Sequence, residues 1–254
     1  MTQKEMILTE EAEYPSDTFA DCYRGDGYTA FYFDRCKDLH EGNHAIIYPE
    51  RITDLRKVLN EVREFYAVKQ KGAAIFHPLA DEYYHYFEEN REIIESCGYE
   101  ITLNDDYRFQ TLTGENTIKR NGSLDIRLGW DDRIETDIIL PSEEYWELES
   151  TKEFASRKDN FTFTGYFGEK AVVYSIIHKS RRFDCVRFDY ILCAKDECGK
   201  GYGSELISFI ADFCRENRFN NCFDWAGPSE NIVRRAGFCD VFTARSGRIN
   251  YVNR

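Results

Sequence analysis

The chain has 254 residues, a length typical of one large domain or two small ones, and it can bury a core without disulfide or metal cross-links. Hydrophobic residues make up 42%, charged residues 31%, and there are five prolines, which excludes fibrous and disordered classes. Asp and Glu total 46 against 33 Lys and Arg, so the net charge is −13. This charge repels nucleic acid and anionic membrane surfaces and favours cationic partners. We therefore expect neither nucleic acid nor a membrane to be a partner.

The cysteines and the N-terminus indicate a cellular compartment. The nine cysteines are scattered and form no Cys-x-x-Cys pair or Cys/His cluster. The first residues, MTQKEMILTEEAEY, are acidic and contain no apolar signal segment. No apolar run reaches the length of about 18 residues that a membrane helix requires. We expect a cytoplasmic protein without a metal site or a disulfide framework.

The first half of the chain alternates between strand and helix patterns. Residues 1–42 carry an aromatic cluster interrupted by Gly25 and Gly27 and give no clear assignment. Apolar runs and helical spacing then predict, in order, a strand at 45–48, a helix at 55–66, a strand at 73–76, a helix at 86–94 and an extended segment at 99–103. Pro49 separates the first strand from its helix, and Gly98 ends the second helix.

The second half begins after a polar, glycine-bounded segment at 113–122, which we take as the boundary between domains 1–122 and 123–254. The patterns that follow predict a helical region at 134–156, a hairpin of strands 161–166 and 171–177, a strand at 186–194, a helix at 206–214, a strand at 221–225, a short helix at 229–235 and a final hairpin ending near Val252. The expected fold class is α/β (α+β), with mixed, mostly antiparallel sheets flanked by helices.

Two parts of the chain share one order of predicted elements. Residues 44–103 and 188–243 each read as strand, helix, strand, short helix, Gly-aromatic and strand. We interpret this as a degenerate internal repeat; the alternative is that any two α/β halves would look this similar. Only the second copy has a glycine-rich turn before its first helix, so a phosphate site is expected only in the C-terminal half.

The glycine-rich segment Cys198–Ser204 (CGKGYGS) lies between a predicted strand and an amphipathic helix. Backbone N–H groups in such a turn, with the N-terminus of the helix, can hold a pyrophosphate, and Lys200 and Ser204 can assist. A P-loop is excluded because its motif does not occur. Asp224 lies where a dinucleotide fold would place its ribose-binding acid, but the glycine spacing and the preceding antiparallel strands argue against that fold. A tight turn without a ligand is the remaining alternative.

Ile191-Leu192-Cys193, the segment CGKGYGSELI, Asn231 and Gly237-Phe238 together resemble the GNAT superfamily of acyl-CoA-dependent N-acyltransferases, whose motif is Arg/Gln-x-x-Gly-x-Gly/Ala. The resemblance covers about 125–254. It implies two GNAT-like halves with the C-terminal half active, and acetyl-CoA as co-substrate. It also implies that the pantetheine arm pairs with the strand at Ile191, Leu192 and Cys193. The implied pyrophosphate and coenzyme contacts are Gly199, Lys200, Gly201, Tyr202, Gly203, Ser204 and Asn231.

This sequence departs from the family pattern in two places. Cys198 stands at the Arg/Gln position, and the short helix near Asn231 lacks the Tyr that family members use as a general acid. The carboxylates of Asp189 and Asp224 are the candidates for the general base, with purely structural roles as the alternative. We reject Cys193 as a covalent nucleophile because no His lies near it in sequence. A backbone N–H near Cys193 is the candidate donor to the developing oxyanion.

The resemblance therefore predicts a transferase: an acyltransferase, specifically a GNAT N-acetyltransferase, that moves an acetyl group to a primary amine by direct attack in a ternary complex. The acidic net charge favours a cationic small molecule or basic peptide as acceptor. Two other classes stay open. One is a catalytically silent acyl-CoA-binding or regulatory module, and the other is a nicotinamide oxidoreductase supported only by the glycine loop and Asp224.

Overall fold

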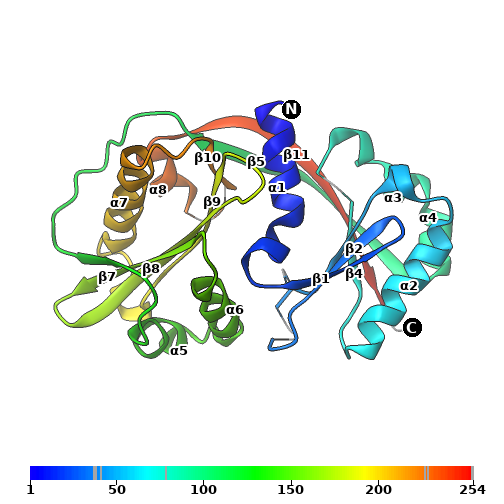
Figure 1. The fold of residues 1–254 in the computed structure, drawn as a ribbon, viewed down its shortest axis with the longest axis horizontal. Coiled ribbons are helices and arrows are strands. Elements are labelled where there is room, and N and C mark those ends of the chain that lie inside the picture. The colour runs from blue at the N-terminus through cyan, green and yellow to red at the C-terminus, as the bar shows by residue number, and fades with distance from the viewer. Residues whose placement is uncertain (37–38, 41, 78, 226, 228, 253–254) are drawn as a thin grey trace. The chain divides into compact units, whose positions relative to one another are not determined.

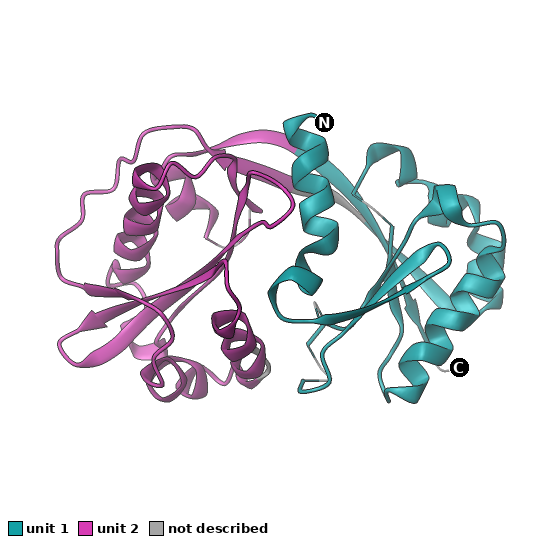
Figure 2. Ribbon diagram, viewed as in Figure 1, with its two compact units in different colours: residues 1–107, 243–254 teal, residues 108–242 magenta. Residues whose placement is uncertain are grey.

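The computed structural model divides the chain into two compact units. Unit 1 contains residues 1–107 and 243–254, and unit 2 contains residues 108–242 (Figure 2). The structure describes residues 1–36, 39–40, 42–77, 79–225, 227 and 229–252. Two long strands, β5 (Tyr99–Leu112) and β11 (Phe238–Tyr251), each contribute residues to both units. In the described part of the chain, every helix is too short or too polar to cross a lipid bilayer.

Unit 1 is a sheet with strand order β1-β2-β3-β4-β11. Its elements are α1 (Gln3–Thr18), β1 (Asp21–Gly25), β2 (Tyr28–Tyr32), β3 (Ala45–Ile47), η1 (Pro49–Arg51), α2 (Leu55–Val68), β4 (Ala74–Phe76), η2 (Asp81–Tyr83), α3 (Tyr86–Glu89) and α4 (Arg91–Ser96). Strands β3 and β4 are parallel and are connected through α2, whereas β1, β2 and β3 pair antiparallel. Unit 1 therefore contains one strand–helix–strand crossover next to a hairpin (Figure 1).

Helix α2 forms because its apolar residues repeat at helical spacing and its start is capped. The Asp54 side chain accepts a hydrogen bond from the Lys57 backbone N–H at 3.1 Å. One face of α2 is buried against the sheet, where it joins Ile47, Ile75 and Phe87 in a single core cluster. The buried residues of that face are Leu55, Val58, Leu59, Val62 and Tyr66. Burial of this stripe stabilises the helix more than its intrinsic propensity does.

Unit 2 has the strand order β5-β10-β9-β8-β7-β6. Its elements are β6 (Asp125–Leu128), a π-helical turn (Ile134–Ile139), α5 (Leu140–Ser142), α6 (Tyr145–Ser156), β7 (Asn160–Phe167), β8 (Lys170–Lys179), β9 (Val186–Cys193), η4 (Lys195–Glu197), α7 (Tyr202–Glu216), β10 (Cys222–Trp225) and α8 (Glu230–Arg235). Strands β7, β8 and β9 pair antiparallel, and β9 and β10 are parallel, connected through α7.

Two separate core clusters in unit 2 hold its helices to the sheet. The buried face of α7 includes Leu206 and Ile210. It packs in one cluster with Val186 of β9 and Cys222 of β10. The second cluster joins the π-helical turn and Phe154 of α6 to Tyr174 of β8. Helix α7 thus lies against the strands that it connects (Figure 1).

The structure differs from the sequence-based expectation in several places. The unassigned N-terminal region forms α1 and the β1–β2 hairpin, and the expected final hairpin is instead the single strand β11. The helical region at 134–156 is interrupted where Pro141 follows the π-helical turn and Glu143 adopts a left-handed conformation with φ 64°. The polar segment 113–122, expected as a domain boundary, lies within unit 2. The two compact units instead divide between residues 107 and 108, inside the long strand β5.

Candidate functional site

The connection from β9 to α7 contains the glycine-rich segment. After Cys193 the chain passes through the η4 turn, and Gly201 is the N-cap of α7. Gly199 and Gly201 have positive φ angles of 81° and 90°. This left-handed backbone strongly favours glycine. A Cβ placed on either glycine would meet no heavy atom within 4 Å, so the space beside this turn is open.

The N-terminus of α7 faces this turn without a side-chain cap. Among the described residues, no side chain caps the helix at Gly201, but the Gly203 backbone N–H in the first turn donates a hydrogen bond to the Cys193 sulfur. The other N–H groups of the first turn lack partners inside the helix. The helix is held in place by its buried face, which includes Leu206, Ile207 and Ile210. The start of this helix follows the open space beside Gly199 and Gly201, and its positive dipole end and the N–H groups that the helix does not use suit it to bind an anion such as a phosphate.

Side-chain charges surround the turn. The Lys200 ammonium lies 2.7 Å from a Glu197 carboxylate oxygen, and Lys170 of β8 lies 2.8 Å from Asp196 and 3.2 Å from Glu197. The hydrogen bond with Lys200 lowers the pKa of Glu197, so this carboxylate stays charged. Cys198, at the family's Arg/Gln position, is exposed, and its thiol contacts the Ala194 carbonyl at 3.5 Å. The Lys170 and Lys200 ammonium groups are therefore already paired, and the backbone N–H groups of the turn are the main feature that could hold an anion.

Strands β9 and β10 pair over a short distance only. Their parallel ladder contains Val186 with Cys222 and Arg187 with Phe223. Beyond that point β9 continues to Cys193 beside β8, while β10 continues beside β5. The β10-facing backbone of the Ile191–Cys193 segment consequently has no strand partner in the described ladder. It is available to pair with an extended ligand.

A β-bulge lies in β9 at Asp189. Ile176 of β8 faces Tyr190, but the next residue, Ile177, faces Phe188, so Asp189 is the extra residue. Because of the bulge, Phe188 packs with the α7 cluster while Tyr190 packs with the opposite cluster. The sequence pattern did not reveal this irregularity.

The two candidate general bases occupy different environments. Asp189 forms a buried ion pair with Arg187, with the two side chains 11% and 9% exposed. Asp224 is 8% exposed and lies opposite Gln110 of β5 in the strand register, just beyond the last β9–β10 pair. The Gln110 side chain donates to Asp240 at 2.8 Å, and its own carbonyl oxygen is buried with no hydrogen-bond partner among the described residues. Asp224 is therefore the candidate at the point where the strands part.

The Cys193 thiol is protonated at neutral pH. Burial raises its pKa to about 11, although the Gly203 backbone hydrogen bond acts in the opposite direction. Thiolate, and not thiol, is the nucleophile. This agrees with the rejection of Cys193 as a covalent nucleophile.

Helix α8 carries the predicted contact Asn231 and two residues that sequence reasoning did not single out, Glu230 and Ile232. Asn231 is exposed on this helix, whereas the neighbouring Ile232 side chain lies 3.9 Å from the Cβ position of Gly203. Arg108 of β5 makes two hydrogen bonds of 2.9 Å to Glu230, which fixes the start of α8. Long-range contacts of this kind have no local sequence signal.

Comparisons with solved structures identify the fold. No family model and no curated protein matches the sequence. Structurally, the chain is similar to a GCN5-related N-acetyltransferase from Kribbella flavida (TM-score 0.67, 8% identity, 98% of this chain and 95% of that chain covered). A GCN5-related N-acetyltransferase-like protein from Streptococcus suis also aligns over nearly full length (TM-score 0.54, 11% identity, 96% and 97%). A functionally unknown conserved protein from Staphylococcus epidermidis does as well (TM-score 0.61, 14% identity, 100% and 98%).

The similarity extends over the whole chain and is not confined to the C-terminal half. The protein therefore has a GNAT-like fold across its full length, with a mixed, mostly antiparallel sheet and flanking helices. The predicted fold class and the resemblance to this superfamily are confirmed at the level of the fold.

Proposed function

We propose that the protein is an acyl-CoA-dependent N-acyltransferase that moves an acetyl group from acetyl-CoA to a primary amine by direct attack in a ternary complex. One observation carries the proposal. Two left-handed glycines, Gly199 and Gly201, border open space directly before the uncapped N-terminus of α7. A pyrophosphate needs several N–H donors and room beside the backbone; the space beside the two glycines supports the proposal, with the N–H groups of the turn and of the helix start as candidate donors.

Residues around the turn fit the other parts of the coenzyme. The backbone of Gly199–Ser204 would hold the pyrophosphate, with Lys200 and Ser204 side chains at its edge. The unpaired edge of β9 at Ile191, Leu192 and Cys193 would pair with the amides of the pantetheine arm. Asn231, exposed on α8, is a candidate contact at the other side.

The bound thioester supplies an activated acyl group. A backbone N–H near Cys193 donates a hydrogen bond to the thioester carbonyl oxygen as negative charge develops there. Asp224 or Asp189 accepts the proton of the attacking amine, directly or through water. The net charge of −13 favours a cationic acceptor, either a small molecule or a basic peptide. Such a reaction fits a cytoplasmic enzyme.

A catalytically silent acyl-CoA-binding module is the second candidate. It is favoured by helix α8, which has only six residues and contains no Tyr to serve as a general acid. Release of free thiol over a panel of amines distinguishes the two. Turnover on any amine contradicts the silent module, whereas binding without turnover across a broad panel favours it.

Calorimetric titration with acetyl-CoA, coenzyme A and NADPH tests the binding site. The Gly201→Glu variant places a carboxylate in the open space beside the turn and strains its backbone. We expect acetyl-CoA affinity to fall at least about a hundredfold, because the anion loses both room and donors. NADPH should not bind.

Gly129→Glu is the matched control. Gly129 also lies in unit 2, has a φ of 114° and has no heavy atom within 4 Å of its Cβ position, but it follows the edge strand β6. This variant adds the same charge and similar strain, and it should bind acetyl-CoA as the native chain does. Failure of the folded native protein to bind either coenzyme A species would refute the acyltransferase proposal. Binding of NADPH would favour an oxidoreductase.

A further inference from the structure

A continuous row of aromatic rings crosses one face of unit 1. Tyr28 and Tyr23 have ring centroids 6.2 Å apart, and Tyr23 stacks on Phe65 at 5.6 Å with an interplanar angle of 20°. Phe65 contacts Tyr32 edge-to-face at 5.7 Å. The tyrosines belong to the β1–β2 hairpin and Phe65 belongs to α2, so two packed elements fix the row.

One end of this row already holds a cation from the chain itself. The Lys69 ammonium lies 3.7 Å from the centroid of the Tyr32 ring and 5.5 Å from that of Phe65. This is the geometry of a cation–π interaction, in which the negative face of the ring attracts the charge. The row is therefore electrostatically suited to cations.

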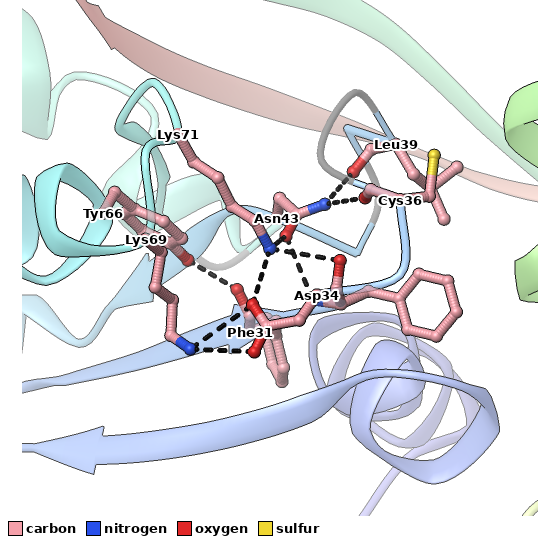
Figure 3. Close-up of polar contacts among 9 residues, drawn as sticks. Phe31, Asp34, Cys36, Leu39, Asn43, Tyr66, Lys69 and Lys71 are labelled. Atoms are coloured by element: carbon pink, nitrogen blue, oxygen red, sulfur yellow. Dashed lines mark hydrogen bonds and ion pairs between the residues drawn. The ribbon is translucent and has the colours of Figure 1, made fainter.

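Lys69 is held at this end by an acidic neighbour. Its ammonium lies 3.2 Å from the Asp34 carboxylate, which also pairs with the buried Lys71 at 3.3 Å (Figure 3). Lys71 in turn donates to the side-chain oxygen of Asn43 and to the Phe33 carbonyl. Because this network holds Lys69 near Tyr32, its ammonium is not free to move along the row.

The other end of the row is open. A groove of about 480 Å³ lies here, within the size range of small-molecule sites; it is lined by Tyr23, Tyr28, Phe65, other residues of α2 and Lys69. Tyr23 is 50% exposed and Val68 is 86% exposed, so this apolar surface faces solvent. Exposed aromatic and aliphatic side chains gathered in a groove are more common at binding sites than on inert surface.

Two carboxylates border the open end. Glu61, Glu64, Phe65 and Val68 follow helical spacing on α2 and line the same groove. Glu61 has a 3.7 Å ion pair with Lys57, while within the described residues Glu64 has no ion-pair partner. An occupant that meets aromatic faces and an unpaired carboxylate gains most if it carries a positive charge on an apolar body.

We propose that this groove is a binding site for a small organic cation, of the alkylammonium class, separate from the acyltransferase site. The cation would lie against the exposed part of the Tyr23 ring, beside Phe65, with Val68 contacting its apolar part and Glu64 its charge. Lys69 also lines the groove, but its ammonium pairs with Asp34 and lies closest to Tyr32, which leaves the Tyr23 and Glu64 side of the groove for the ligand. The proposal does not depend on whether the protein binds acetyl-CoA.

Choline and its uncharged analogue 3,3-dimethyl-1-butanol are the probes, because they share shape and differ in charge. The readout is the NMR shift of the Val68 methyl groups in the full-length protein, at matched ionic strength. We expect saturable shifts with choline and affinity weaker by about two- to fivefold for the alcohol, the size of an exposed cation–π interaction. Equal affinity for both probes, or no saturable shift with choline, overturns the proposal.

Variants assign the effect to the groove. Glu64→Gln and Tyr23→Ala should each weaken choline binding by about two- to fivefold. Glu92→Gln removes an exposed carboxylate from α4 in the same unit and should change nothing. Glu64→Gln keeps the test valid if Tyr23→Ala does not fold. Unchanged choline affinity in Glu64→Gln, or concentration-dependent dimerisation that Tyr23→Ala abolishes, contradicts a cation site and identifies the surface as a protein interface.

Discussion

The connections that precede helices α2 and α7 differ in how they cap the first turn of the helix. Each helix joins two parallel strands, β3 to β4 in unit 1 and β9 to β10 in unit 2. Before α2, Asp54 caps the first turn, and Arg51 packs 4.8 Å from the Tyr48 ring. Before α7, Gly201 takes the cap position, and no side chain in the described part of the chain caps the helix there. In the first connection Asp54 accepts from a first-turn N–H, whereas in the second the Gly203 N–H bonds the Cys193 sulfur and the other first-turn donors are the candidates to bind a ligand.

The strands that precede the two helices also differ in how far they extend beyond their last paired residue. Strand β3 ends at Ile47, one residue after its last pair with β4. Strand β9 continues to Cys193, well beyond its last pair with β10 at Arg187. Of these two connections, the one in unit 2 therefore combines a helix without a side-chain cap at its N-cap residue with a strand that extends beyond its last pair. One crossover can be a purely structural element in one unit and a candidate binding site in the other.

Removal of buried side chains from the two helices should have the largest effect. Ile210→Ala in α7 and Leu59→Ala in α2 each delete a fully buried side chain from a core cluster. We expect each to lower the free energy of unfolding by about 2–5 kcal/mol, measured by denaturant titration. A loss below about 1 kcal/mol for either variant would show that its helix is not packed as described.

The reactivity of Cys193 tests the part of β9 that has no counterpart in β3. Its pKa is about 11 instead of the ordinary 9.0. The thiolate fraction at pH 8 should therefore be lower by about a hundredfold, since each unit of pKa above the pH lowers that fraction about tenfold. Alkylation by iodoacetamide, followed by mass spectrometry, should therefore be slow at pH 8 and accelerate as the pH approaches 11. Rapid modification of Cys193 at pH 8 in the folded protein would contradict its burial.

The smallest effect is expected from the cap of α2. Asp54→Ala removes the acceptor for the Lys57 N–H and should destabilise the protein by about 1 kcal/mol. Acetyl-CoA binding should not change, because the site proposed for it lies in unit 2. Thr53→Ala, one residue earlier and exposed, serves as the control. If Asp54→Ala weakened acetyl-CoA binding, the functional contrast between the two connections would be lost.

The strongest sequence signals were local. Apolar spacing predicted α2 and α7, and the hairpin around Gly168 appears as β7 and β8. The position of the glycine turn between a strand and a helix was also readable, because glycine is the residue that tolerates the φ angles found at Gly199 and Gly201. The N-terminal aromatic segment was not assignable, since its strands are defined by pairing partners and not by alternation.

The sequence by itself determined the order of the main helices and strands, the glycine turn and the acidic surface charge, because each depends on residues close together in the chain. Only the tertiary structure decided where β9 and β10 stop pairing, the bulge at Asp189 and its ion pair with Arg187. It alone brought Tyr23 of β1 onto Phe65 of α2. These features arise from contacts between distant segments, whose geometry is set by packing and hydrogen-bond register and leaves little trace in local composition.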